Sequence, residues 1–233
     1  MSTILAIETA TPSCSAALRI DGEVVVRAEV GNNIHSQVLL GMIESLLAEA
    51  QLGPQALDAV TVGQGPGSFT GLRIGVGVGQ GLAFGANCPM IGVSSLDALA
   101  LQALGDNSVI AAIDARMGEV YWCEYQKIGD QIKRLSGLQV TPPTAVKFSN
   151  ADVRGVVVGS AWSAYPNQFS ALNEWSAEIQ SSIVYPSAGS LLRLAEEQYR
   201  QRKWLSAALF APMYVRNDVA KKSTKKLPGR RPE

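Results

Sequence analysis

Hydrophobic and polar positions follow two different periods along the first part of this chain, and each period predicts one kind of element. Residues 3–9 are apolar on both faces, which is typical of a buried strand. Two further apolar runs follow, and Asp21-Gly22 between them is a two-residue hairpin signal. The pattern then changes to the spacing of an amphipathic helix. We expect strands at 3–9, 14–20, 23–30 and 59–62 and a helix at 36–50.

Residues 63–85, GQGPGSFTGLRIGVGVGQGLAFG, organise the rest of the chain. The stretch begins as a glycine-rich loop, after which Ser68 or Thr70 can cap a helix. Two stripes of glycine at i, i+4 spacing follow, and each helical glycine costs about 1 kcal/mol relative to alanine. Close packing of another backbone against the glycines would compensate for this cost, so we expect a helix that is buried nearly all round. It would be the packing axis of the protein, and also a candidate packing axis of an assembly. The stripes are Gly71, Gly75 and Gly79, and Gly77, Gly81 and Gly85.

The second half repeats the opening. Ile7-Glu8-Thr9 and Ile113-Asp114-Ala115 occupy equivalent places in two strand–acid–turn–strand units, so the repeat is one of topology. This predicts an α/β fold of the actin-like, ribonuclease H-like kind, with two subdomains facing across a cleft. The subdomains are expected at 1–105 and 106–216, followed by a basic mobile tail at 217–233. Later strands are expected at 89–93, 109–114, 119–125, 132–140, 155–159, 179–185 and 212–216, and helices at 96–104, 163–172 and 187–203.

Charge and cysteine usage narrow the class of protein. The formal net charge is zero, but residues 216–233 hold seven Lys or Arg, so an acidic body carries a basic tail. Three cysteines without C-x-x-C spacing fit a reducing compartment. Arg73 and Gln80 interrupt the most apolar segment, and the first residues lack a basic signal-peptide region. We therefore expect a cytoplasmic protein with no membrane span.

The residues at the expected cleft have two interpretations. Glu8, Thr9, Thr11 and Ser13 lie where a first hairpin would hold a phosphate, and Asp114 marks the second hairpin. Either they form a nucleotide site or the hairpins serve folding alone, and the shortage of further metal ligands favours folding. His35 is the only histidine, which excludes a histidine-cluster metal site, and its place before a helix favours a capping or surface role. Asp114 and Arg116 form either a turn-shaping ion pair or a substrate clamp, and the former is favoured.

Several motifs carry a resemblance to a known family. They are ILAIETATPSCSAAL, GQGPGSFTGLRIGVGVGQGLA, PMIGVSSLDALA, IDARMGEVYW and the ending PMYVR…KKLPG. Together they resemble the bacterial TsaB (YeaZ) family of tRNA threonylcarbamoyladenosine biosynthesis. The resemblance implies an actin-like fold and a role in passing a threonylcarbamoyl group from its adenylate to the adenosine beside the tRNA anticodon. It also implies two partners, the catalytic relative TsaD and the ATPase TsaE, with tRNA bound through the complex. No cofactor is assigned to this chain itself, and ATP or ADP is a candidate ligand of the complex.

The same resemblance implies that this chain is noncatalytic. The catalytic relative carries two metal-binding histidines whose places correspond to Ser95 and Leu99 here, and neither can hold a metal. The glycine helix and the helix at 36–50 are then the expected docking face. Two alternatives stay open, an independent nucleotide hydrolase or peptidase-like enzyme, and a self-associating scaffold that pairs as a homodimer. The expected interface residues are Gly71, Gly75, Val78, Gly79, Leu82, Val38, Met42 and Leu46.

Overall fold

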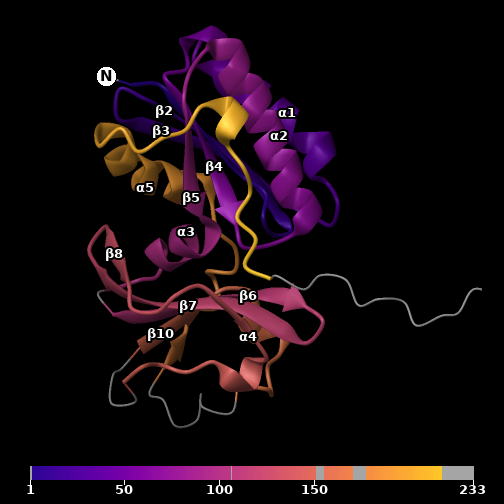
Figure 1. Ribbon diagram of the computed structural model, residues 1–233, viewed down its shortest axis with the longest axis vertical. Coiled ribbons are helices and arrows are strands. Elements are labelled where there is room, and N and C mark those ends of the chain that lie inside the picture. Colours follow the sequence, from indigo (N-terminus) through magenta and orange to yellow (C-terminus); the bar gives the residue numbers. More distant parts are fainter. Residues whose placement is uncertain (1, 106, 151–154, 170–176, 217–233) are drawn as a thin grey trace, which may run out of the picture.

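The computed structural model places two sheets one above the other along the long axis of the molecule (Figure 1). It describes residues 2–105, 107–150, 155–169 and 177–216. The first lobe holds a five-stranded sheet in the order β3-β2-β1-β4-β5, in which β1 pairs antiparallel with β2 and parallel with β4. Its strands are β1 (Ile4–Glu8), β2 (Ser13–Ile20), β3 (Glu23–Val30), β4 (Ala59–Gly65) and β5 (Met90–Ser94).

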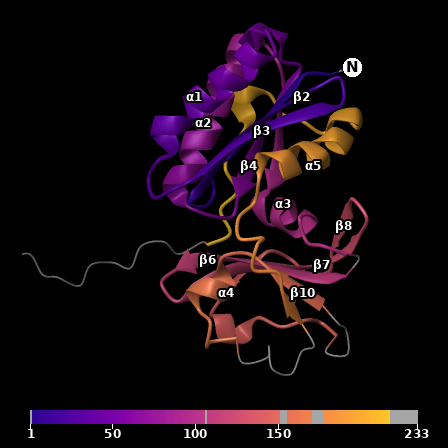
Figure 2. The same cartoon turned by 180° about the vertical axis from the view of Figure 1, so that it is seen from behind.

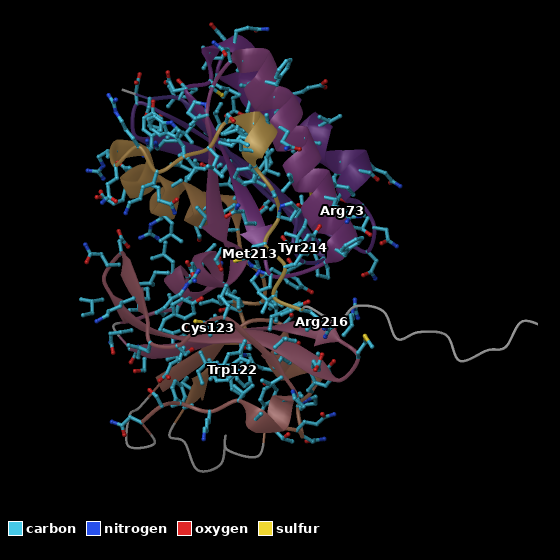
Figure 3. The ribbon with its side chains drawn as sticks, in the orientation of Figure 1. Arg73, Trp122, Cys123, Met213, Tyr214 and Arg216 are labelled. Atoms are coloured by element: carbon cyan, nitrogen blue, oxygen red, sulfur yellow. The ribbon has the colours of Figure 1, made fainter. Side chains whose placement is uncertain are left out.

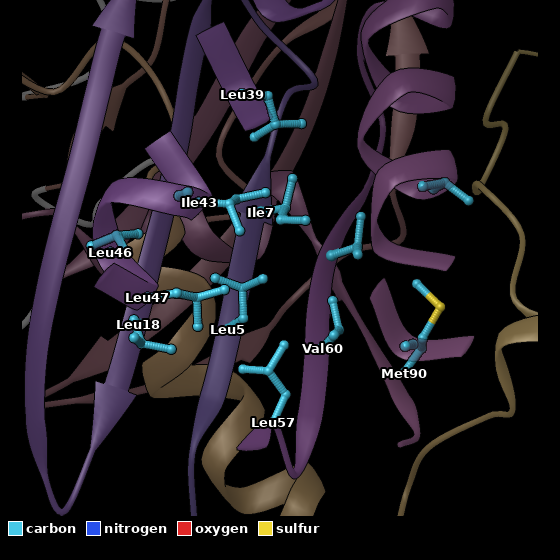
Figure 4. Packing of buried hydrophobic residues seen from close by; sticks show 14 of the residues in the cluster. Leu5, Ile7, Leu18, Leu39, Ile43, Leu46, Leu47, Leu57, Val60 and Met90 are labelled. Carbon is cyan, nitrogen blue, oxygen red and sulfur yellow. The ribbon is translucent and has the colours of Figure 1, made fainter. Parts of the chain in front are cut away.

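Helices cover both faces of this first sheet. On one face lie α1 (His35–Glu49) and α2 (Phe69–Ala86), and on the other lies α5 (Ala188–Arg200), as Figure 2 shows from behind. Alternate residues of β1 serve the two layers. Leu5 and Ile7 pack with α1 and α2 (Figure 4), whereas Ile4 and Ala6 pack with α5. The first strand is therefore apolar on both faces because both faces are covered.

The second lobe is a six-stranded sheet in the order β11-β10-β6-β7-β8, with β9 paired to the remaining length of β7. The short helix α3 (Ser95–Leu101) lies between the two sheets (Figure 1) and packs against β6 and β7. The other elements of this lobe are β6 (Ser108–Arg116), β7 (Glu119–Ile128), β8 (Gln131–Arg134), β9 (Gln139–Thr141), β10 (Gly155–Val158), α4 (Ala161–Ala164) and β11 (Glu178–Ile179). Short 3-10 turns occupy Pro54–Ala56, Pro143–Ala145 and Ala207–Leu209.

Local sequence signals account for the ends of these helices. Ser68 and Ser94 cap α2 and α3, each accepting a hydrogen bond from the backbone N–H three residues on. Ser187 does the same for α5. Helix α2 ends at Asn87, which adopts the left-handed conformation with φ 52°. Of the two caps considered for the glycine helix, Ser68 is therefore the one used.

The structure corrects five sequence-based expectations about the second half. In place of the helix expected at 163–172 it has α4 at Ala161–Ala164, and in place of the strand expected at 179–185 it has β11 at Glu178–Ile179. The strand expected at 132–140 is two strands, β8 and β9, both antiparallel to β7. The segment at 212–216 lies outside the named strands. The expected unit 106–216 does not stay with the second sheet, because α5 returns to pack on β1, β2, β4 and β5 of the first. The expected basic tail at 217–233 lies outside the described residues.

Residues 205–216, here called the C-terminal strap, cross from the first lobe to the second along α2 (Figure 1). The strap begins as a β-bridge between Leu205 and Met90. Gln80 then donates to the carbonyl oxygens of Ala207 and Phe210, at 2.8 and 3.0 Å. At the far end Arg216 pairs with Glu119 of β7. The strap thus ties the two lobes together with contacts that join residues more than 90 positions apart.

Asp97 of α3 links this helix to the sheet of the second lobe through hydrogen bonds to β7 and β8. Its carboxylate accepts two hydrogen bonds from Arg134 of β8, at 2.8 and 2.7 Å, and one from the hydroxyl of the fully buried Tyr125, at 2.8 Å. We expect Asp97→Ala to lower the free energy of unfolding by about 2 kcal/mol, because the tyrosine hydroxyl loses its buried acceptor. Urea denaturation measures this. Asp130→Ala, which removes an exposed ion pair to Arg193, is the control and should cost at most about 1 kcal/mol; equal losses would contradict the prediction.

Candidate functional site

The two glycine stripes of α2 have opposite environments. Gly71, Gly75 and Gly79 face inward, where a Cβ would overlap the carbonyl oxygen of Thr9, the Thr9 hydroxyl and the Val62 side chain respectively. The Thr9 hydroxyl donates to the carbonyl oxygen of Gly71 at 2.8 Å, which locks α2 onto the end of β1. The close approach that the glycines predicted therefore exists, but inside this chain. These three residues cannot form the docking surface expected of them.

The second stripe is exposed. Apart from the backbone of α2 itself, no heavy atom of the described residues lies within 4 Å of a Cβ built on Gly77, Gly81 or Gly85. Phe84 beside them is 84% exposed, so the expectation of a helix buried nearly all round is wrong for the single chain. Leu46, a further expected interface residue, is enclosed in the core at 1% exposure. Half-buried apolar side chains of α1 and α2 border the stripe. Together with the exposed residues they form a surface called here the α1–α2 face, which consists of Val38, Met42, Gly77, Val78, Gly81, Leu82, Phe84 and Gly85.

Glu8 ends β1 as a fully buried carboxyl group. It accepts hydrogen bonds from the Ala10 backbone N–H at 2.7 Å and from the Ser95 hydroxyl at 2.8 Å. Burial raises the pKa of Glu8 above its ordinary value, although these hydrogen bonds partly offset the shift. Gly63 leaves the space for this carboxyl group, since a Cβ at Gly63 would overlap it. The acid is thus held within the protein by its own neighbours.

Ser95 and Leu99 lie where the family resemblance places the metal-binding histidines of the catalytic relative. Ser95 is fully buried and its hydroxyl is used by Glu8. Leu99 is fully buried among the apolar side chains that α3 shares with β6 and β7. Among the described residues, no group of three or more His, Cys, Asp and Glu side chains could hold a metal ion. These two positions are filled by core packing.

The raised pKa of Glu8 makes a pH dependence testable. The folded state holds the proton more tightly than the unfolded state, so this group stabilises the fold fully below its unfolded pKa and progressively less as the pH rises through its folded pKa. Glu8→Gln removes that titration, which can change the free energy of unfolding by at most about 1.4 kcal/mol per pH unit. We expect urea titrations across about pH 4 to 8 to favour the variant increasingly over the wild type as pH rises. Parallel pH profiles would contradict the prediction.

A cleft of about 800 Å³ lies between the lobes. Its walls come from the turn after β1, the β3–α1 loop, the first turn of α2, the β6–β7 hairpin, α4 and the C-terminal strap. Asp114 lines it and accepts hydrogen bonds from the Arg116 backbone N–H and from the Tyr165 hydroxyl, both at 2.8 Å. Asp114 and Arg116 also form an ion pair at 3.3 Å across the hairpin turn. The capping or surface role expected of His35 is wrong, because Ile34 is the N-cap of α1 and His35 is buried. Its Nε2 contacts the Thr11 carbonyl oxygen at 2.8 Å.

Only one of the four residues proposed for a nucleotide-binding site lines the cleft. Thr11 lines it, and its buried hydroxyl has no hydrogen-bond partner among the described residues. Glu8 and Thr9 are fully buried and bonded to their own chain, and Ser13 is not among the residues that form the walls. Binding of ATP or ADP at an assembled complex stays a prediction.

Sequence reasoning missed the residues that hold the strap. The side-chain amide of Gln64 donates to the Ala211 carbonyl oxygen at 3.0 Å. The backbone carbonyl oxygen of Gln64 accepts a hydrogen bond from the Met213 backbone N–H at 2.9 Å. Arg73 donates to the Tyr214 hydroxyl at 3.2 Å (Figure 3). The signal was present, because Arg73 and Gln80 are the two strongly polar residues in an otherwise apolar and glycine-rich helix. These two residues indicated that the helix has polar contacts, but the sequence did not show which segment supplies them.

Comparisons with known proteins agree in both sequence and fold. The family model described as TsaD, tRNA N6-adenosine threonylcarbamoyltransferase, matches residues 26–225. The chain is 40% identical over 235 residues to the tRNA threonylcarbamoyladenosine biosynthesis protein TsaB of Escherichia coli K12, covering 97% of this chain and 99% of that protein. The Haemophilus influenzae protein of the same name is 39% identical over 239 residues and covers 98% of each chain.

Solved structures extend this agreement to the fold. A structure described as YeaZ from Pseudomonas aeruginosa matches with a TM-score of 0.85 at 38% identity, covering 92% of this chain and all of that one. A second Pseudomonas aeruginosa structure, of an uncharacterized protein with similarity to peptidase YEAZ, matches with the same TM-score. No helix among the described residues is long and apolar enough to cross a bilayer. With its motifs, its two-lobed α/β fold and these nearly full-length relatives in agreement, this chain belongs to the TsaB (YeaZ) family of tRNA threonylcarbamoyladenosine biosynthesis proteins.

Proposed function

We propose that this chain is the noncatalytic partner subunit for threonylcarbamoyl transfer to the adenosine beside the tRNA anticodon. It acts with a catalytic subunit of the TsaD family and the ATPase TsaE, and it meets tRNA through the complex. The observation that carries the proposal is that Ser95 and Leu99 stand at the positions where the catalytic relative has its metal-binding histidines. Ser95 is engaged by Glu8 and Leu99 is packed in the core, so neither side chain is available to a metal.

The α1–α2 face is the proposed docking surface for the catalytic subunit. Support comes from its composition, since exposed glycines, half-buried aliphatic side chains and the exposed Phe84 leave an apolar surface that a partner can approach closely. It differs from the original set of interface residues, because the inward glycines and Leu46 are excluded. The other half of that set, Val38, Met42, Val78 and Leu82, is retained.

The contribution of such a subunit is thermodynamic. A partner that binds the competent state of the catalytic subunit better than its other states raises the population of the competent state by that difference in affinity. No reacting group from this chain is needed for that effect. The same face can pair two copies of this chain when the catalytic subunit is absent, and the two complexes would then compete for one surface.

The decisive experiment is an in vitro transfer assay with tRNA, the catalytic subunit and the ATPase, with and without this chain. We expect transfer to require it, and size-exclusion chromatography to show it eluting with the catalytic subunit. Transfer that runs equally well without it would overturn the proposal. Hydrolysis of a nucleotide or peptide by this chain alone would instead favour the independent enzyme.

A further inference from the structure

Phe69 and Arg73 of α2 form a cluster with Tyr214 of the C-terminal strap. Figure 3 labels Arg73 and Tyr214. The guanidinium carbon of Arg73 lies 3.6 Å from the centre of the Phe69 ring, and its Nε donates to the Tyr214 hydroxyl. The two aromatic rings lie 5.8 Å apart. Phe69 is 49% exposed and Tyr214 is 48% exposed, so the cluster lies at the surface. Arg73 is thereby held in one orientation from two sides.

Within the described residues, the charge of Arg73 has no carboxylate partner. It is the only charged residue of α2, and no carboxylate in the described part of the chain lies within ion-pair distance of it. The contacts with Phe69 and Tyr214 use its face and its Nε, which leaves the two terminal amino groups for another acceptor. A planar guanidinium fixed in this way is suited to a bidentate bond with a carboxylate. Phe69 and Tyr214, here called the aromatic clamp, already restrict the rotamers of Arg73, so binding a partner costs little further side-chain entropy.

The cluster borders the proposed docking surface. Arg73 precedes Gly77 by four residues, so the two lie about 40° apart around the helix axis on the outer side of α2. Paired aromatic rings and an arginine at the edge of an apolar face are the residue types that dominate protein–protein binding energy. The surface composition therefore fits a protein partner.

A nucleic-acid partner fits less well. Binding to a phosphate backbone needs several free cations. The two other arginines near this end of the cleft are already paired, Arg116 with Asp114 and Arg216 with Glu119. Among the residues that the structure describes, one free guanidinium flanked by aromatic rings at this place matches a single carboxylate better than a row of phosphates.

We propose that the Phe69–Arg73–Tyr214 cluster binds a carboxylate side chain of the catalytic subunit and is the energetic centre of that interface. This inference rests on the proposed function, because it names the chemistry by which the docking surface recognises its partner. It also extends the interface from α1 and α2 to the C-terminal strap, since Tyr214 supplies one side of the clamp.

The test is the affinity of the purified catalytic subunit for the full chain and its variants, measured by calorimetry. We expect Arg73→Gln to weaken binding at least about tenfold. Arg73→Lys keeps the charge but loses the fork and the stacking, and we expect it to lose most of the affinity as well. Arg200→Gln on α5, an exposed arginine on the opposite layer of the lobe, is the control and should bind as the wild type does.

A charge swap identifies the acceptor. Arg73→Glu should abolish binding, and an Asp or Glu→Arg substitution in the catalytic subunit should restore it. Arg73→Gln binding within twofold of the wild type would overturn the inference while leaving the proposed function intact. A loss of tRNA affinity with unchanged affinity for the catalytic subunit would also overturn it, and would assign the cluster to RNA. Failure of the wild-type chain to bind the catalytic subunit would overturn the proposed function itself.

Discussion

Replacing Gly71 with alanine is expected to destabilise the fold by about 3 kcal/mol or more. The new Cβ would overlap the carbonyl oxygen of Thr9, and backbone atoms at the end of a buried strand cannot move aside as a flexible side chain can. The helix would have to lift from β1, which also breaks the bond from the Thr9 hydroxyl to the Gly71 carbonyl oxygen. Urea denaturation of purified protein measures the change through the midpoint and slope.

Gly77→Ala is the matched control on the same helix. Outside the helix backbone, no atom of the described chain lies within 4 Å of a Cβ at this position. The substitution therefore gains helix propensity without a clash and should stabilise the fold by about 1 kcal/mol. The two variants differ only in which stripe they alter, and they should therefore shift the midpoint in opposite directions. Shifts of the same sign would show that the inward stripe does not pack as described.

Gly81→Leu is expected to abolish binding to the catalytic subunit while the chain stays folded. Gly81 lies on the α1–α2 face with open space around it, so a leucine fits the monomer and improves its helix propensity. In an assembly that needs close approach over this stripe, the same side chain holds the partner away. We expect a loss of at least about a hundredfold in affinity, with threonylcarbamoyl transfer falling in parallel at limiting concentrations.

Two measurements keep that result interpretable. Thermal unfolding should show the Gly81→Leu protein to be at least as stable as the wild type. Glu197→Leu on α5 puts the same exposed side chain on the other helical layer and should leave binding unchanged. Normal binding by Gly81→Leu would move the docking surface away from α2. Gly75→Leu cannot serve as this test, because Gly75 is packed against Thr9 and the variant would fail by unfolding.

Much of the architecture was predictable because its signals are local. The Asp21-Gly22 hairpin, the Ser68 cap of α2 and the helical spacing of α1 and α5 each depend on residues within one or two turns of one another. The acid at the end of each first strand was also found where expected, at Glu8 and Asp114. The candidate site was predicted less well, since Glu8 and Thr9 proved to be internal packing residues.

The sequence by itself determined that this chain has a close-packed glycine helix, two strand–acid–turn units and a family. Only the tertiary structure decided which glycine stripe is enclosed, because both stripes have the same spacing and composition, and the choice depends on where β1 and β4 lie. It also decided the path of the strap and the return of α5 to the first sheet. Those placements join residues more than 90 positions apart, and no periodicity within a single segment encodes such a contact.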